Sequence, residues 1–261
     1  MDQFRIDIGN GVARLTLTRP EKHNAFDDRL IDGLTAALRK LEADPAVRIL
    51  VLAAEGPSFS AGAELDWMKR AAAAGQAENL ADAHKLAGLM HTLDAFPGTT
   101  IAAVQGPAYG GGVGLVACCD IAIASTAARF ALSEVKLGLI PSVIGPYVVA
   151  AIGARQARRW FQTAEIFDAA TARAIDLVHE VVEPGALEAK VGEIVEALRR
   201  NAPSACGEAK RLVGDLLYRP VDAALTDMTA LRIAEIRASD EAREGIDAFL
   251  TRRAAAWIRG G

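Results

Sequence analysis

The sequence contains little cysteine and no long run of charges of one sign. Its three cysteines (Cys118, Cys119 and Cys206) do not suggest a disulfide framework, because two of them are adjacent in an apolar segment. We therefore expect reduced, buried thiols in a cytoplasmic protein. The formal net charge is −4, and Lys and Arg are not clustered, so nucleic acid and anionic membrane surfaces are not expected as partners. A small molecule is the expected ligand.

Several sequence signals for other protein classes are also missing. No apolar run is long enough to span a membrane, and the first residues alternate like a strand instead of forming a signal or transit peptide. The four histidines have no metal-ligand spacing, so we expect no metal. The phosphate-loop motif G-x-x-x-x-G-K-[ST] is absent.

The first two hundred residues show strands alternating with helices. Residues 4–19 resemble a β-hairpin around Gly9-Asn10-Gly11, and residues 27–43 have helical apolar spacing with Asp27 as a plausible cap. Short apolar runs at 47–53 and 100–105 are typical of strands covered on both faces, and a helical region that is interrupted near Gly75 lies between them. A short helix at 112–118 and strands at 120–124 and 129–132 follow. This order indicates an α/β fold with parallel β-α units.

From about Pro203 onward only amphipathic helix is predicted. We therefore divide the chain into a core at 1–200 and a helical region at 201–261. The helices contain more apolar residues than a free surface helix needs, including Leu231, Ile246 and Phe249. They could pack against their own core or against a neighbouring subunit, and the sequence leaves both possibilities open.

Two loops rich in small residues each follow a buried strand. The first is SFSAGAEL at 58–65 and the second is GPAYGGGVGL at 106–115. A match of 112–117 to the dinucleotide motif G-x-G-x-x-A lies too far from the strand end to be persuasive. Glycines at a strand-to-helix junction could instead let main-chain N–H groups approach an anionic oxygen, or they could simply allow tight packing.

Three linked motifs resemble the crotonase superfamily, the enoyl-CoA hydratases and isomerases: SAGAEL, VQGPAYGGGVGLVACCDIAIAS and ARFALSEVKLGLIP. The resemblance extends from RPEKHNAFD to EGIDAFLTRR. It implies a crotonase (ClpP-like) spiral of ββα turns with a C-terminal α-helical trimerisation region. It also implies an acyl-CoA thioester as substrate, a homotrimer or dimer of trimers, and no dissociable cofactor.

The resemblance also assigns residues to roles. The N–H groups of Ala63 and Gly111 would hold the thioester oxygen, and Glu134 would be the catalytic carboxylate. The substrate-binding residues would be Lys22, Ala25, Ala61, Leu65, Gly114 and Phe249. Glu64 takes the place of an Asp found in relatives, and a role at the start of a helix is the better interpretation.

Hydratases of the superfamily use two glutamates, and this chain departs from that pattern. The second matches Glu134, whereas the first falls on Gly114. The segment 137–149 also replaces a glycine-rich PGxGG run and resembles bacterial crotonases that act on 3-methylglutaconyl-CoA and related branched acyl-CoAs. We expect a hydratase of a 2-enoyl-CoA; the alternatives are a double-bond isomerase that uses Glu134 alone and a non-catalytic acyl-CoA binder.

Overall fold

The computed structural model describes residues 3–259 and begins with a β-hairpin. Strands β1 (Phe4–Gly9) and β2 (Val12–Leu17) pair antiparallel, with Phe4 opposite Leu17. Asn10 and Gly11 form the turn, and both have positive φ, which Gly and Asn adopt more readily than other residues. The hairpin predicted from the alternating pattern is confirmed.

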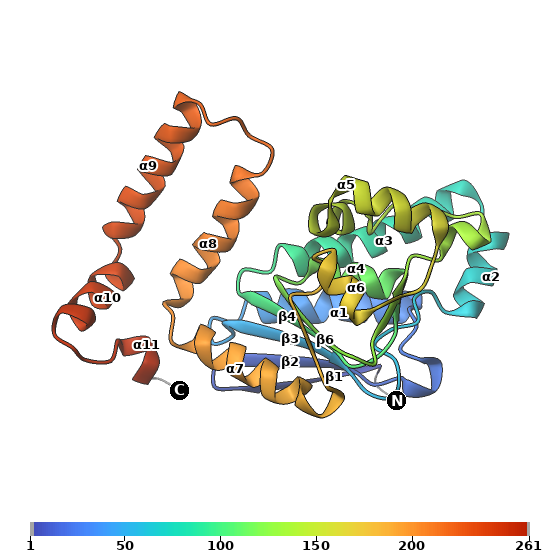
Figure 1. Cartoon of the computed structure of the whole chain (residues 1–261), viewed down its shortest axis with the longest axis horizontal. Coiled ribbons are helices and arrows are strands. Elements are labelled where there is room, and N and C mark those ends of the chain that lie inside the picture. The colour runs from blue at the N-terminus through green and yellow to red at the C-terminus, as the bar shows by residue number, and fades with distance from the viewer. Residues whose placement is uncertain (1–2, 260–261) are drawn as a thin grey trace.

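A six-stranded sheet forms the centre of the core (Figure 1), and its strand order is β1-β2-β3-β4-β6-β9. The added strands are β3 (Ile49–Ala54), β4 (Thr99–Val104), β6 (Ile121–Ser125) and β9 (Glu180–Val182). All neighbours from β2 to β9 pair in parallel. The carboxyl ends of these strands therefore lie at one edge of the sheet, where α/β folds commonly bind ligands.

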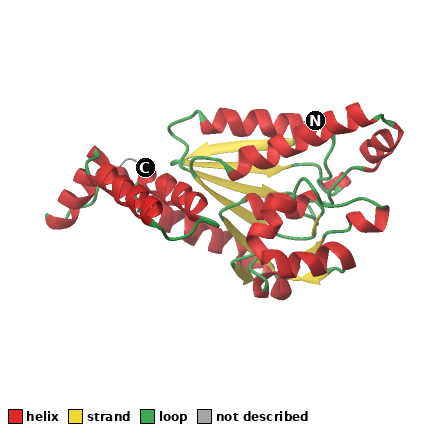
Figure 2. Cartoon of the chain, turned by 90° about the horizontal axis from the view of Figure 1, so that it is seen from above, coloured by secondary structure: helices red, strands yellow, loops and turns green. Residues whose placement is uncertain are grey.

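Helices cover both faces of the large sheet (Figure 2). Helix α1 (Asp28–Glu42) and helix α3 (Gln76–Asp94) pack on the face that contains Leu15, Leu50 and Leu52. Helix α7 (Leu187–Arg199) covers the opposite face, which contains Ile49, Val51 and Ile101. The apolar runs of β3 and β4 are buried on both faces, as their composition predicts.

A second, smaller sheet lies beyond the carboxyl ends of these strands. It has the order β5-β7-β8, built from β5 (Ala108–Tyr109), β7 (Arg129–Ala131) and β8 (Phe167–Asp168). The remaining core elements are the short helices η1 (Pro20–Lys22), η2 (Glu134–Leu137) and η3 (Pro184–Ala186), and the α-helices α2 (Leu65–Ala73), α4 (Gly111–Cys118), α5 (Gly145–Thr163) and α6 (Ala169–Ala174). Strands β5, β8 and β9 were not predicted.

The last helices form an arm that extends away from the sheet (Figures 1 and 2). The arm consists of α8 (Pro203–Leu216), α9 (Ala223–Arg237), α10 (Asp240–Leu250) and α11 (Ala256–Arg259). Lys210 of α8 forms an ion pair with Asp120, which also accepts hydrogen bonds from the main chain and hydroxyl of Thr100. Many large apolar side chains of the arm are exposed: Val213, Leu216, Leu217, Tyr218, Val221, Leu231, Ile233, Ile246, Phe249 and Leu250.

The structure shows whether the cysteine thiols are buried and whether a helix could span a membrane. All three cysteines are free; Cys118 and Cys119 are buried as expected, but Cys206 is partly exposed. Within the part of the chain that the structure describes, no helix has the length and apolarity needed to cross a membrane. The same residues include no cluster of three or more His, Cys, Asp or Glu side chains suited to a metal ion.

Candidate active site

The two small-residue loops lie side by side at the carboxyl edge of the sheet. Ser60 and Ala108 form a parallel bridge, and the N–H of Tyr109 donates to the carbonyl of Ser60 at 2.8 Å. Gly62, with φ of +84°, packs so tightly that a Cβ on it would stand 2.9 Å from the carbonyl oxygen of Tyr109. This contact places Ala63 and Gly111 on neighbouring chain segments.

The N–H groups of Ala63 and Gly111 are available to a ligand. Around them the main chain is paired: Glu64 donates to the carbonyl of Phe26 at 2.8 Å, and Gly110 donates to that of Ala131 at 2.9 Å. Within residues 3–259, neither Ala63 nor Gly111 has an acceptor for its N–H. Gly111 is also the first residue of α4, where N–H groups have no partner inside the helix and the dipole favours negative charge.

Steric contacts explain the glycine triplet. A Cβ on Gly111 would stand 2.6 Å from the ring of Phe26, and one on Gly112 would stand 2.8 Å from the carbonyl oxygen of Ser60. Gly110 has φ of +50°, which disfavours other residues. The glycines therefore permit close packing, which is one of the two explanations considered for the sequence.

Glu134 lies beside this loop, at the start of η2. A Cβ on Gly110 would stand 3.2 Å from Oε1 of Glu134, so the carboxylate is next to the glycine that precedes Gly111. Its Oε2 atom is buried and has no hydrogen-bond partner among the described residues. Burial raises the pKa of the Glu134 carboxyl above its ordinary value. Such a group is suited to exchange protons with a bound molecule.

Gly114 lies one turn further along α4, and the structure places no carboxylate there. The atoms nearest to the position of a Cβ on Gly114 belong to the side chains of Ile144 and Met90. Gly114 itself is buried. The space that a side chain at position 114 would need is therefore occupied by apolar groups.

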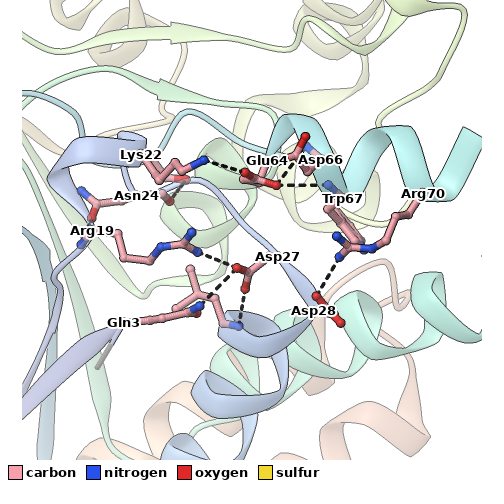
Figure 3. A network of polar contacts seen from close by, with 12 residues as sticks. Gln3, Arg19, Lys22, Asn24, Asp27, Asp28, Glu64, Asp66, Trp67 and Arg70 are labelled. Carbon is pink, nitrogen blue, oxygen red and sulfur yellow. Dashed lines mark hydrogen bonds and ion pairs between the residues drawn. The ribbon is translucent and has the colours of Figure 1, made fainter. Parts of the chain in front are cut away.

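A polar network joins the loop at residues 19–27 to the start of α2 (Figure 3). Lys22 forms an ion pair with Glu64, with 3.0 Å between Nζ and Oε1. The other carboxylate oxygen of Glu64 accepts from the N–H groups of Asp66 and Trp67, so Glu64 caps α2 as expected. The hydrogen bond from Lys22 and those from the main chain lower the pKa of Glu64, and the bond to Glu64 raises the pKa of Lys22.

Asn24 lies in the Lys22–Ala25 region that the resemblance assigns to substrate binding, but its own role was not predicted. Its side chain is fully buried; Nδ2 donates to the carbonyls of Glu55 and Ser58 at 2.9 Å, and Oδ1 accepts from the N–H of Arg19. Its own carbonyl accepts from the hydroxyl of Ser60. Asn24 thus fixes the loop that precedes Ala63. The only signal in the sequence was that Asn24 is a polar residue directly before the apolar residues Ala25 and Phe26.

The other predicted binding residues fall into two groups. Ala61, whose N–H donates to the carbonyl of His23 at 2.9 Å, and Leu65 at the start of α2 are exposed near the N–H pair, whereas Ala25 is buried beneath the loop. Phe249 is 82% exposed on α10, in the arm on the far side of the molecule from α2 (Figure 1). The chain does not bring Phe249 to its own site.

A separate cavity lies at the amino ends of β2 and β3, at the opposite end of the sheet from this site. It is lined by Asn10, Gly11, Ala46, Arg48, Glu196, Arg199, Arg200, Trp257 and Ile258. Two of its arginines have partners: Arg48 donates to the carbonyl of Trp257, and Arg199 forms an ion pair with Glu196. The candidate active site is the region around the carboxyl-edge loops, not this cavity.

Comparisons with known proteins identify the family of the chain. The family model for enoyl-CoA hydratase/isomerase matches residues 7–259. The chain is 31% identical to a crotonyl-CoA hydratase of Syntrophomonas wolfei, over 95% of this chain and 94% of that protein. It is also 31% identical to an enoyl-CoA isomerase/hydratase of Mycosarcoma maydis, over 93% and 91% of the two chains.

The fold also closely matches those of solved structures. An enoyl-CoA hydratase from Shewanella pealeana superposes with a TM-score of 0.96 and 44% identity, over 98% of this chain and 96% of that one. The spiral α/β fold expected from the motifs is therefore confirmed. The chain belongs to the enoyl-CoA hydratase/isomerase family of the crotonase superfamily and is an enzyme of the hydratase type.

Proposed function

We propose that this enzyme reversibly adds water across the double bond of a 2-enoyl-CoA. The observation that supports this most is the unpartnered, buried Oε2 of Glu134 beside a main-chain N–H pair that has no acceptor among the described residues. The N–H groups of Ala63 and Gly111 would bind the thioester oxygen. This oxygen gains negative charge as the enolate forms, and each such donor contributes about 3 kcal/mol of transition-state stabilisation.

In the proposed reaction Glu134 carries out both proton transfers. Its carboxylate removes a proton from a water molecule as the water oxygen bonds to C3, and electrons of the double bond move onto the thioester oxygen. The carboxyl group then returns that proton to C2, which restores the thioester carbonyl. No cofactor is used, because the coenzyme A thioester of the substrate is itself the electron acceptor.

A double-bond isomerase is the second candidate, and the apolar groups around Gly114 favour it. With one carboxylate, Glu134 could remove a proton from C2 of a 3-enoyl-CoA and return it to C4, which shifts the double bond into conjugation with the thioester. This reaction needs neither a water molecule nor a second acid. The isomerase/hydratase name of the Mycosarcoma maydis relative fits either reaction.

Absorbance of the conjugated thioester separates the candidates. Crotonyl-CoA should lose this absorbance under hydration, and a 3-enoyl-CoA should gain it under isomerisation. If neither substrate changes while the enzyme binds acyl-CoA in a titration, the third possibility, a non-catalytic acyl-CoA binder, is supported and both catalytic proposals are wrong.

The acyl group that we propose is branched, of the 3-methylglutaconyl-CoA type or related to it. The segment that follows Glu134 in the chain exposes the apolar side chains of Leu137, Leu139 and Ile140. A branched substrate gains from contact with such side chains. The ratio of kcat/KM for 3-methylglutaconyl-CoA to that for crotonyl-CoA should exceed one; a ratio well below one contradicts this assignment.

We further propose that the exposed apolar residues of α8–α10 are covered by other copies of the chain, in a trimer or a dimer of trimers. The arm exposes many large apolar side chains, and extended apolar surface of this kind commonly marks a protein–protein contact. In such an assembly Phe249 would be available to a neighbouring copy, and this is the only way for it to contribute to a site. The mass in solution, measured by light scattering, distinguishes a monomer, a trimer and a hexamer.

A further inference from the structure

Two departures of the sequence from the hydratase pattern meet in space. Gly114 lies on α4 and Ile144 immediately precedes α5, two helices that pack against each other. A Cβ on Gly114 would stand 2.3 Å from Cγ2 and 2.9 Å from Cβ of Ile144. Cε of Met90 lies 3.2 Å from the same point. No side chain can therefore be added at position 114 while Ile144 keeps its place.

This contact is close to the candidate carboxylate. The N–H of Gly114 donates to the carbonyl of Gly110 at 3.2 Å, so the two glycines are one helical turn apart, a rise of about 5.4 Å. Gly110 is the residue against which Oε1 of Glu134 lies. Ile144, which is 3% exposed, therefore packs against the helix one turn beyond the glycine that Glu134 lies against.

The backbone at Ile144 imposes no requirement for isoleucine. Its φ of −85° and ψ of −16° are ordinary, and its carbonyl accepts from the N–H of Val148 whatever the side chain. Glycine suits this N-cap position of α5 better than isoleucine does, and alanine suits it about as well as isoleucine. The side chain of Ile144 is therefore not needed for the path of the chain, and its effect is to fill space.

We propose that Ile144 determines the balance between hydration and isomerisation in this enzyme. Its methyl group excludes a second carboxylate and additional water from the region beside Gly114, so that every proton transfer passes through Glu134. Hydration then relies on one carboxylate for both proton transfers, and isomerisation, which needs one base and no water, competes with it. This inference rests on the function proposed above and names the residue that controls its outcome.

The test is to exchange the apolar group for an acid. In the double variant G114E/I144G the glutamate has the space that Ile144 vacates, and glutamate also favours a helix more than glycine does. We expect hydration of crotonyl-CoA to rise at least tenfold relative to isomerisation of 3-hexenoyl-CoA, because a positioned acid contributes about 10²–10⁴-fold. G114Q/I144G is the matched control, with the same shape and no acid, and should not show this gain.

A single substitution provides a second measurement that does not depend on folding of the double variants. I144A should raise the ratio of hydration to isomerisation several-fold by admitting water. I49A is its control, because Ile49 is also 3% exposed but lies on the other face of the sheet, and its ratio should equal that of the wild type.

The outcomes separate this inference from the proposed function. If the wild type converts neither substrate, the proposed function is wrong. If the wild type is active but the ratio is the same in I144A, or the Glu and Gln double variants give equal ratios, Ile144 does not control the reaction and the inference is overturned.

Discussion

The carboxylate of Glu134 lies directly against Gly110, with Oε1 3.2 Å from the point where a Cβ on that glycine would stand. Because Gly111 follows Gly110 directly, the Glu134 carboxylate and the N–H of Gly111 lie next to the same small region of the site. We predict that Glu134→Gln lowers kcat about 10²–10⁴-fold and leaves the affinity for acyl-CoA nearly unchanged. Turnover and titration calorimetry of the variant check this. Unchanged turnover would remove Glu134 from the mechanism.

The raised pKa of Glu134 predicts how the activity depends on pH. As the base, the group has to be deprotonated, so activity should fall on acidification at a higher pH than an ordinary glutamate would require. A profile of kcat/KM against pH between about 4 and 9 measures the acid limb. An acid limb at the position of a solvated glutamate contradicts the prediction.

The same burial has a consequence for stability. A carboxyl whose folded pKa is raised binds protons more tightly in the folded state, so its contribution to stability is lost as pH rises through the window between the two pKa values. Glu134→Gln removes a buried charge and should raise the Tm by a few degrees at pH 8. At pH 4 the difference should be much smaller. A lower Tm at pH 8 would contradict this account.

Asn24 should be important for both folding and activity. Asn24→Ala leaves the part-buried N–H of Arg19 and carbonyl of Glu55 without a partner, which costs about 1–3 kcal/mol for each, whereas the carbonyl of Ser58 keeps its bond from Gln105. We expect a loss of stability of at least about 2 kcal/mol and a lower kcat, because the loop before Ala63 is released. Chemical denaturation and turnover measure the two effects. The exposed Asn79, changed to Ala in the same way, is the control.

Lys22 should act mainly on substrate binding. Its ammonium group is half exposed and is held by Glu64 near the N–H pair, where it could meet the phosphates of coenzyme A. Lys22→Met should raise KM roughly threefold to tenfold, more at low salt than at high salt, with little change in kcat. Lys85→Met, which breaks the surface pair with Asp32, is the matched control. An equal effect in both variants would argue against a role for Lys22 in binding.

The proposed assembly can be tested through the arm. Aspartate at Phe249 and Leu250 places charges on two of its most exposed apolar side chains. We expect this pair of substitutions to lower the mass observed by light scattering, since burial of a charge in an interface is costly. Aspartate at Ile8 on β1, which is also exposed, should leave the mass unchanged. An unchanged mass in the arm variant would place the interface elsewhere.

The sequence predicted the parts of the fold that have a strong pattern of their own. Strands β3 and β4 are short apolar runs because both faces of the sheet are covered, and α1 shows helical spacing with a side-chain cap from Asp27. Strands β5, β8 and β9 have only two or three residues each, which is too short for a periodic pattern. Pairing with distant segments determines them.

The candidate site was predicted less completely. The motifs drew attention to Ala63, Gly111 and Glu134, and the structure brings their segments together at one sheet edge. The contact between Gly114 and Ile144 could not be predicted, because it depends on how α5 packs on α4. The bonds of Asn24 to Glu55 and Ser58 are likewise tertiary contacts with no local pattern.

The free N–H groups of Ala63 and Gly111 belong to the main chain, and this limits what mutation can do to them. Replacing either residue by another with a side chain retains the donor, and only proline removes it. Natural selection must therefore preserve the path of the two loops. Residues such as Gly62 and Asn24 determine that path. Many residue types could therefore stand at position 63, whereas the ring of Phe26 restricts the residue type at position 111.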